Sequence, residues 1–264
     1  MITKRQIEDL ASQFKIDQSS IVREYLQLQF LNYLYQEKEA ENIFFKGGTA
    51  IHLLLNSSRF SEDLDFSTKL DQQEIKNMIK SVQKKLNKEL PGLTIFLLYQ
   101  GKKSIRFRLK YSLSDFKYPF IIRLDFSLKE KPLDQAVSSP LLTNFPMAFF
   151  PIINHFSSQE MLVEKIRAFL ARGKGRDIFD LWFLLEKKVP FKFKLVDQKL
   201  KQVGKKFDDQ KLTQKIKKYP QKKMEQDLSR FLPQPQRKMI KTLKNRLVLV
   251  IKNTNLIESG QKVN

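Results

Sequence analysis

Two aspartates one residue apart are the side chains in this sequence best suited to hold a divalent cation. Asp63 and Asp65 lie in the segment RFSEDLDFS, residues 59–67. If this segment is a strand, both carboxylates project from one face, while Leu64 and Phe66 point into the core. Two like charges held so close repel each other unless a cation lies between them, and Mg²⁺ or Mn²⁺ prefers such oxygen ligands. The alternative for an isolated Asp-x-Asp pair is a solvated polar face on an edge strand.

A pair of glycines precedes these acids and could bind phosphate. Gly47 and Gly48 separate the apolar stub NIFFK from the helical pattern TAIHLLLNS, where Thr49 adds a hydroxyl. Glycine allows backbone angles and a close approach that a Cβ forbids, and the first N–H groups of a helix attract anions. Plain turn geometry is the alternative reason for a glycine pair here. Arg59 could bind a base or a phosphate, or it could stabilise its own turn.

Asp125 could complete the acidic set. It stands near the end of the apolar segment FIIRLDFSL. Neighbouring strands lie about 5 Å apart, so its carboxylate could join those of Asp63 and Asp65. Three carboxylates on two strands beside a phosphate-binding turn would form a two-metal site for nucleotidyl transfer. An ion pair of Asp125 with Arg123 or Arg106 is the competing explanation.

The elements that position these residues follow from the hydrophobic periodicity. Apolar residues three and four positions apart predict two helices in the first forty residues, with Ser19 or Ser20 as the cap of the second, and another helix over residues 71–89. Strand-like runs bounded by glycine or proline lie among and after these helices. The predicted strands cover residues 42–46, 63–67, 93–100, 104–112 and 118–128.

The order of the elements predicts an α+β fold. Helical patterns return over residues 157–172 and 176–188 and continue beyond Pro190. We therefore expect a mixed sheet of about five strands flanked by helices, followed by a helical carboxyl-terminal domain. The expected domains are residues 1–150, with the sheet and the amino-terminal helices, and residues 151–264, helical and strongly basic.

The charge of the chain favours a polyanionic partner. The net charge is +21, and the part from Lys187 onward holds 22 basic and 6 acidic residues, a net of +16. Such one-ended positive charge is typical of proteins that bind nucleic acid, although solubility is an alternative reason for it. The chain has no cysteine and two histidines, which excludes thiolate and histidine-cluster metal sites. It shows no membrane-spanning run and no signal-peptide core, so we expect a cytoplasmic protein without a membrane partner.

Three motifs together resemble a known family. The segments GGTAI, RFSEDLDFS and EKIRAFLARGKGRDIFDLWFLL, in this order, are similar to the AbiEii-type toxins of the abortive-infection AbiE systems. These toxins belong to the DNA polymerase β-like nucleotidyltransferase superfamily. The resemblance implies that Gly47, Gly48 and Thr49 meet the triphosphate of an NTP and that Asp63 and Asp65 bind metal.

The resemblance also assigns a later pair of site residues. It implies that Lys165 and Asp177 complete the site, with Asp180 as an alternative to Asp177. A lysine ammonium beside a triphosphate stabilises developing negative charge, and an aspartate could orient it or act as a base. Asp177 also has a structural explanation, because an acid in the first turn of a helix is favoured by the helix dipole.

The function expected from this resemblance is that of a phage-defence toxin. Members of the family are neutralised by a separately encoded antitoxin, and some add nucleotides to the 3′ end of tRNA. We therefore expect a Mg²⁺-dependent transfer of NMP from an NTP to RNA, with tRNA as the favoured acceptor and an antitoxin, for which a transcriptional regulator is one candidate, as partner. A non-catalytic nucleic-acid-binding protein and a small-molecule nucleotidyltransferase are the alternatives.

Overall fold

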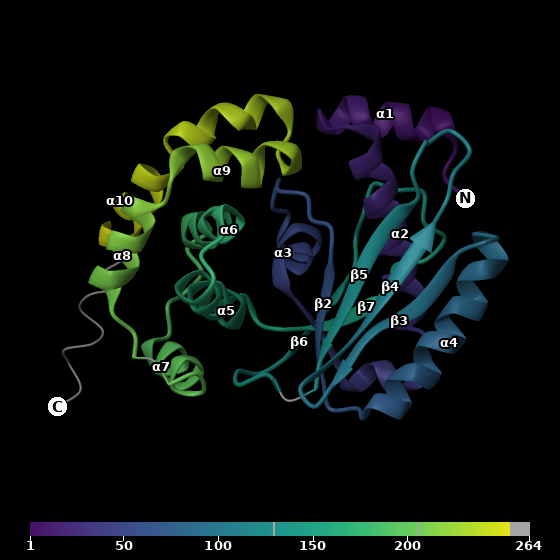
Figure 1. Ribbon diagram of the computed structural model, residues 1–264, viewed down its shortest axis with the longest axis horizontal. Coiled ribbons are helices and arrows are strands. Elements are labelled where there is room, and N and C mark those ends of the chain that lie inside the picture. The colour runs from purple at the N-terminus through teal and green to yellow at the C-terminus, as the bar shows by residue number, and fades with distance from the viewer. Residues whose placement is uncertain (129, 205, 254–264) are drawn as a thin grey trace. The chain divides into compact units, whose positions relative to one another are not determined.

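The chain forms two compact units, and the boundary between them in the sequence lies between Phe156 and Ser157. The computed structural model describes residues 1–128, 130–204 and 206–253 (Figure 1). The expected division lay after residue 150. In the structure the first unit extends to Phe156, because a short strand, β7 (Ile152–His155), still pairs within its sheet.

The first unit contains four α-helices among its described residues. They are α1 (Lys4–Phe14), α2 (Gln18–Leu34), α3 (Gly47–Leu55) and α4 (Gln72–Glu89), and a short 3₁₀ helix covers Lys38–Asn42. The prediction that Ser19 or Ser20 caps α2 is wrong. The carboxylate of Asp17 caps this helix by accepting hydrogen bonds from the backbone N–H and the hydroxyl of Ser20, both at 2.9 Å. An ionised carboxylate is the stronger acceptor for a free N–H at a helix start.

Seven strands form one mixed sheet, in the order β3-β4-β5-β2-β1-β7-β6 (Figure 1). The strands are β1 (Ile43–Lys46), β2 (Leu64–Thr68), β3 (Thr94–Gly101), β4 (Ser104–Tyr111), β5 (Phe120–Ser127), β6 (Val137–Pro140) and β7. The expectation of about five strands missed β6 and β7. Both have four residues, too few for alternation to show, and they lie in a proline- and serine-rich stretch.

Strand pairing fixes which side chains share a face of the sheet. Phe45, Phe66 and Phe126 lie on three adjacent strands, and their rings pack in sequence with centroids 5.4 and 4.8 Å apart. Phe30 of α2 lies against Phe66 at 6.3 Å, so this face is the core face. Helices α2 and α4 pack together and contact β5 and β3 (Figure 1). Residues one position along each strand therefore project from the opposite face.

The second unit is helical in its described part. Its α-helices are α5 (Ser158–Ala171), α6 (Gly175–Glu186), α7 (Phe193–Lys201), α8 (Asp209–Lys218), α9 (Gln221–Leu228) and α10 (Leu243–Asn253). Apolar side chains such as Phe169 and Phe179 are fully buried between them. Lys199 is also buried, with its ammonium 2.9 Å from the carboxylates of both Glu160 and Glu164. The chain thus has the predicted α+β architecture, and none of its described helices is long and apolar enough to cross a bilayer.

Candidate active site

The turn between β1 and α3 needs glycine at its first position. Gly47 has φ +86°, which an L side chain rarely adopts, and a Cβ on it would overlap the carboxylate of Asp65. A Cβ on Gly48 would overlap the guanidinium of Arg59. The glycine pair therefore lets the backbone at the helix start approach both a carboxylate and a buried arginine.

Arg59 fastens the loop that precedes the acids. Its side chain is 2% exposed, and Nη1 donates to the carbonyl of Phe60 at 2.9 Å. The amide of Gln27, on α2, donates to the carbonyl of Ser61 at 3.0 Å. Its guanidinium lies against Gly48, a position suited to the turn-stabilising role, and the binding of a base or a phosphate by Arg59 stays a prediction.

Thr49 joins α3 to the acidic loop. Its side chain is 1% exposed, and its hydroxyl donates to the backbone carbonyl of Asp63. The hydroxyl proton is used in this bond, so Thr49 helps to position the loop that presents Asp63. The triphosphate contact predicted for this turn stays a prediction, and the first backbone N–H groups of α3 are the candidate donors for it.

His52 holds the same loop from the other side. Its Nε2 lies 2.8 Å from a carboxylate oxygen of Glu24, and its Nδ1 lies against the carbonyl of Ser57. Burial lowers the pKa of His52, but the charge and hydrogen bond of Glu24, together with the Ser57 carbonyl, raise it above its ordinary value. Both ring nitrogens face acceptors, so the imidazolium, which donates from both, is the form that fits.

The acids lie together at neighbouring positions of two strands. Asp65 on β2 is directly opposite Asp125 on β5 in a parallel register, and Asp63 precedes β2 by one residue. Leu64 and Phe66 are fully buried on the core face, so the alternation predicted for this segment is confirmed. Burial raises the pKa of Asp125, and the charge of Asp65 raises it further.

Two arginines oppose this accumulation of negative charge. Arg106 Nε lies 2.8 Å from Asp125 Oδ2, and the guanidinium of Arg123 pairs with the carboxylate of Asp63. Both arginines lower the pKa of Asp125 without cancelling the rise. The competing explanation for Asp125, an ion pair with Arg106, is therefore also present in the structure.

A divalent cation fits part of this acidic set. Among the described residues, no group of three or more acidic, histidine or cysteine side chains is arranged to hold a metal ion. Asp65 and Asp125 supply adjacent carboxylate oxygens, the donors that Mg²⁺ and Mn²⁺ prefer. Asp63 would join them when its carboxylate exchanges Arg123 for the cation, because its backbone is already held beside them by Thr49.

The predicted site residues of the second unit form a buried ionic cluster. Lys165 Nζ lies 2.6 Å from Asp180 Oδ2 and 3.4 Å from Asp177 Oδ1, and Arg172 reaches Asp177 at 3.3 Å. Asp177 and Asp180 are one turn apart on α6, and their side chains are 1% exposed. Lys165 is thus oriented by both aspartates. The other predicted site residues belong to the first unit.

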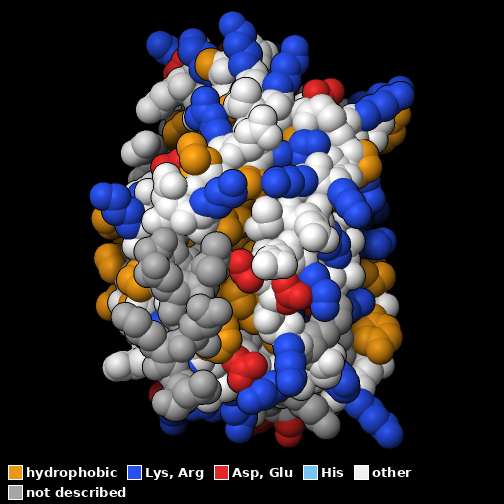
Figure 2. Space-filling model, turned by 90° about the vertical axis from the view of Figure 1, so that its left-hand side faces the viewer, with side chains coloured by type: hydrophobic (Ala, Val, Ile, Leu, Met, Phe, Trp, Pro, Cys, Tyr) orange, Lys and Arg blue, Asp and Glu red, His pale blue; other side chains and the backbone are white. Residues whose placement is uncertain are grey.

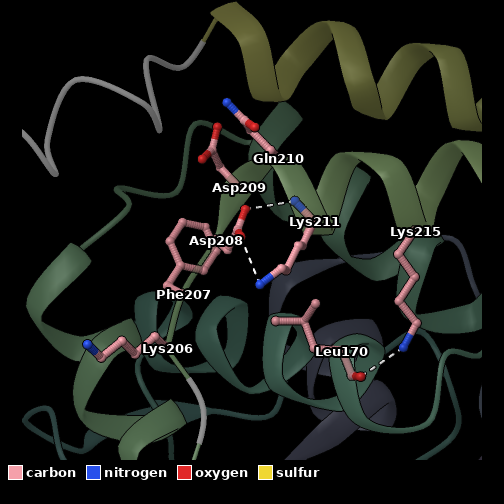
Figure 3. A pocket seen from close by; sticks show the side chains of 8 residues that line it. All are labelled: Leu170, Lys206, Phe207, Asp208, Asp209, Gln210, Lys211 and Lys215. Atoms are coloured by element: carbon pink, nitrogen blue, oxygen red, sulfur yellow. Dashed lines mark hydrogen bonds and ion pairs between the residues drawn. The ribbon is translucent and has the colours of Figure 1, made fainter.

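One pocket of the second unit is lined by none of the predicted site residues. It has a volume of about 830 Å³ and is lined by residues of α5 and of the segment that begins α8. In Figure 3, the carboxylate of Asp208 interacts with Lys211, and the ammonium of Lys215 donates a hydrogen bond to the carbonyl of Leu170. Asp208 accepts the N–H of Lys211 at 2.8 Å, which is an ordinary helix cap. Asp208 is thus the N-cap of α8, which gives this carboxylate a structural role.

Sequence reasoning missed two residues near the acids. Lys46 ends β1 opposite Asp65; it is buried, with its ammonium paired to Glu130 and 3.3 Å from the hydroxyl of Ser127. His52 is the other, and its partner Glu24 lies 28 positions away in the chain. The sequence offered one signal for Lys46, namely its position at the end of an apolar strand and directly before the glycine pair.

Comparisons with known proteins agree with the fold and with the motifs. A family model described as "Nucleotidyl transferase AbiEii toxin, Type IV TA system" matches residues 29–247, and no curated protein matches the sequence. MenT4, a nucleotidyltransferase toxin from Mycobacterium tuberculosis, has a similar structure, with a TM-score of 0.65, 18% identity, and coverage of 98% of this chain and 92% of MenT4. JHP933 from Helicobacter pylori has a TM-score of 0.56 and 18% identity, with 93% of this chain and 97% of JHP933 covered. The family model spans most of the chain, including the glycine turn, the acids and the Lys165 cluster, so this protein belongs to the AbiEii family of nucleotidyltransferase toxins.

Proposed function

We propose that this protein uses Mg²⁺, or Mn²⁺ in its place, to transfer NMP from an NTP to RNA, with the 3′ end of tRNA as the acceptor. The contact between the glycine turn and the acid pair carries this proposal. A Cβ on Gly47 would overlap Asp65, and Asp65 lies opposite Asp125. A helix start that attracts phosphate therefore adjoins the carboxylates that would hold its cation.

In the first unit we assign nucleotide binding to the turn and metal binding to the acids. The first backbone N–H groups of α3, at Gly47, Gly48 and Thr49, would donate hydrogen bonds to the triphosphate. Arg59, which is buried with its guanidinium against Gly48, would stabilise the conformation of the turn. Asp63 and Asp65, joined by Asp125, would hold the divalent cation, which when bound neutralises phosphate charge and activates the attacking hydroxyl.

In the second unit we assign charge stabilisation to Lys165. The family resemblance suggests this role, and the cluster supports it, since Asp180 and Asp177 hold the ammonium at 2.6 and 3.4 Å. A preorganised cation needs no reorganisation when negative charge develops in the transition state. Asp177 and Asp180 are positioning residues here, because they would act through Lys165.

RNA as acceptor is supported by the charge of the second unit. From Lys187 on, basic residues exceed acidic ones by 16. A second pocket, of about 470 Å³, is lined by five basic side chains: Arg172, Lys211, Lys215, Lys218 and Lys223. In Figure 2, Lys and Arg side chains are spread over much of the face, while acidic ones form a few small groups. We expect steep salt dependence of RNA binding, because contacts to phosphates release counterions.

A cognate antitoxin is the second partner. The family is described as the toxin of a type IV toxin–antitoxin system. We propose that the antitoxin is encoded separately, with a transcriptional regulator as one candidate, and that both proteins act in the cytoplasm, where NTPs and tRNA are found. Co-expression with the adjacent gene should restore the growth of cells that the toxin alone arrests. Continued arrest in its presence would exclude that gene product.

Incubation of the full chain with labelled NTPs and total tRNA tests the reaction. Wild type with Mg²⁺ should label RNA, and Asp63→Ala or removal of the metal with EDTA should abolish labelling. Asp9→Ala, which alters an exposed carboxylate on α1, is the matched control and should behave as wild type. No label on any RNA, or equal labelling by Asp63→Ala, would contradict the proposal. Metal-independent binding without labelling would instead favour a nucleic-acid-binding role.

A further inference from the structure

The edge of the sheet carries exposed aromatic rings stacked on arginines. On β3, Phe96 is 42% and Tyr99 49% exposed. Each lies opposite an arginine of β4: the guanidinium of Arg106 lies 5.1 Å from the ring centroid of Tyr99, and that of Arg108 lies 5.9 Å from the ring of Phe96. An aromatic ring backed by a guanidinium is a platform on which nucleobases stack.

This platform leads directly to the candidate metal-binding acids. Across β4 and β5, Arg106 lies opposite Asp125 and Arg108 opposite Arg123, whose guanidinium pairs with Asp63. The row of side chains that starts at Tyr99 thus ends at Asp125, and the row that starts at Phe96 ends at Arg123 and its partner Asp63. With about 4.8 Å between neighbouring strands, β3 and β2 are roughly 14 Å apart, enough for a short single strand to lie across the face. We call Phe96, Tyr99, Arg106, Arg108 and Arg123 the aromatic–arginine face.

The charges on this face favour an anionic ligand. Arg108 and Arg123 are directly opposite each other, and like charges in that position destabilise a strand pair. Within residues 1–128, 130–204 and 206–253, Arg108 has no carboxylate partner, and its recorded contact is the ring of Phe96. A phosphate between the two guanidinium groups would remove this repulsion.

The backbone edge of β3 is poorly suited to an added protein strand. Side chains of α4 already bond its outer groups: Gln83 accepts from the N–H of Ile95 at 2.6 Å, and Gln72 donates to the carbonyl of Gly101 at 2.8 Å. Strand addition needs these groups free. What the hairpin offers to a ligand is its rings and its guanidinium groups, which suits nucleic acid better than protein.

We propose that the aromatic–arginine face binds the single-stranded end of the acceptor RNA and leads its 3′ hydroxyl to Asp63 and Asp65. Bases stack on Tyr99 and Phe96, and the phosphates between them pair with Arg108 and Arg123. The inference rests on the proposed transfer to RNA and deepens it, because it assigns binding of the acceptor end beside the acids to this face of the sheet.

Binding of a short RNA tests the assignment without catalysis. The probe is a ten-nucleotide single-stranded RNA with a 5′ fluorophore, titrated with the full chain without NTP and followed by fluorescence anisotropy. Tyr99→Ala should raise Kd at least about fivefold, the loss expected for one unstacked base. Arg108→Ala should raise Kd and reduce the salt slope by about 0.7, the value for one phosphate on a single strand. Tyr118→Ala and Arg5→Ala, exposed residues outside the face, are the matched controls.

The transfer reaction separates this inference from the proposed function. In the labelling assay, Tyr99→Ala should raise KM for RNA and leave KM for NTP unchanged, whereas a merely structural defect would move both. Unchanged RNA affinity in both variants overturns the inference even if wild type transfers NMP. The inference is also overturned if the two variants still bind RNA but no longer bind a protein partner. Absence of transfer by wild type, with RNA binding lost in the two variants, would overturn the proposed reaction and leave the RNA-binding face supported.

Discussion

Asp65 and Asp125 lie directly opposite each other on the parallel strands β2 and β5. Burial raises the pKa of Asp125, and the charge of Asp65 adds to the rise, while Arg106 and Arg123 oppose it. A carboxyl group whose pKa is raised in the folded state stabilises the protein below its unfolded pKa of 3.8, and this contribution is lost as pH rises through the folded pKa. At neutral pH the repulsion between the two carboxylates therefore lowers the stability of the folded protein, and a bound cation would offset this repulsion.

The first prediction concerns the pKa of Asp125. Asp65→Asn should lower it, because the substitution removes a negative charge that raises it, whereas Arg106→Ala should raise it further by removing the paired cation. A carbon-13 NMR titration of the side-chain carboxyl groups measures both shifts. Asp115→Asn, in the loop between β4 and β5, is the control and should leave the pKa unchanged. If Asp65→Asn does not move the pKa, the two carboxylates do not interact.

The second prediction separates backbone strain at the glycine turn from contact with Asp65. Gly47 and Gly92 have nearly equal φ, +86° and +85°, but a Cβ on Gly92 meets nothing within 4 Å. Gly92→Ala should cost about 1–2 kcal/mol of unfolding free energy from strain alone and leave activity intact. Gly47→Ala should cost more and abolish nucleotidyl transfer, because it also displaces the carboxylate of Asp65. Urea denaturation and the labelling assay measure the two effects, and equal behaviour of both variants would refute a special role for the turn.

The local parts of the site could be predicted from the sequence. Alternation in the segment around Leu64 placed both aspartates on one face, and the glycine pair marked the junction of strand and helix. The capping of α4 by Asp71 is similarly local, since its carboxylate bonds backbone N–H groups two and three residues on. Such features depend on residues a few positions apart, where period and turn chemistry decide the structure.

The parts that depend on long-range pairing could not be predicted. The position of β5 beside β2, which puts Asp125 opposite Asp65, follows from pairing between segments about sixty residues apart. The same holds for Glu24 and His52, and for β7, which pairs with β1 through one recorded position, Phe45 opposite His155. Nothing in the local pattern distinguishes these partners from others of the same type.

The third prediction uses the two histidines, whose pKa values shift in opposite directions. His52 has a raised pKa, so it contributes stability that is complete below pH 6.5 and is lost as pH rises through its folded pKa. His155 has a lowered pKa, caused by burial, so its contribution is present above pH 6.5 and is lost as pH falls through its folded pKa. In His52→Gln, the unfolding free energy should no longer fall as pH rises above 6.5. In His155→Gln, it should no longer fall as pH drops below 6.5.

Unfolding free energies from urea titrations between pH 5 and pH 9 measure these slopes. With two histidines in the chain, two ring signals in proton NMR give the pKa values directly. Glu24→Gln should lower the pKa of His52, because it removes the charge that raises it, and should leave His155 unaffected. If stability does not depend on pH in the window above 6.5, or if Glu24→Gln leaves the His52 signal unchanged, His52 is not held as an imidazolium.

The last prediction separates the structural role of Lys165 from its proposed role in the reaction. Lys165→Met leaves the buried carboxylates of Asp177 and Asp180 without their shared cation and should cost about 3–5 kcal/mol of unfolding free energy. Arg172→Ala removes a partner whose side chain is 56% exposed and should cost less than about 1 kcal/mol. The single tryptophan, Trp182 on α6, makes fluorescence during urea unfolding a direct probe of the second unit.

A triple variant, Lys165→Met with Asp177→Asn and Asp180→Asn, is the decisive control. It removes the charges of all three side chains while keeping their approximate volumes, so none of these buried groups is left charged without its partner. We expect the triple variant to recover most of the stability lost in Lys165→Met but none of the transfer activity, because the ammonium proposed to stabilise the triphosphate would still be missing. Activity that returns together with stability would show that Lys165 serves the fold alone.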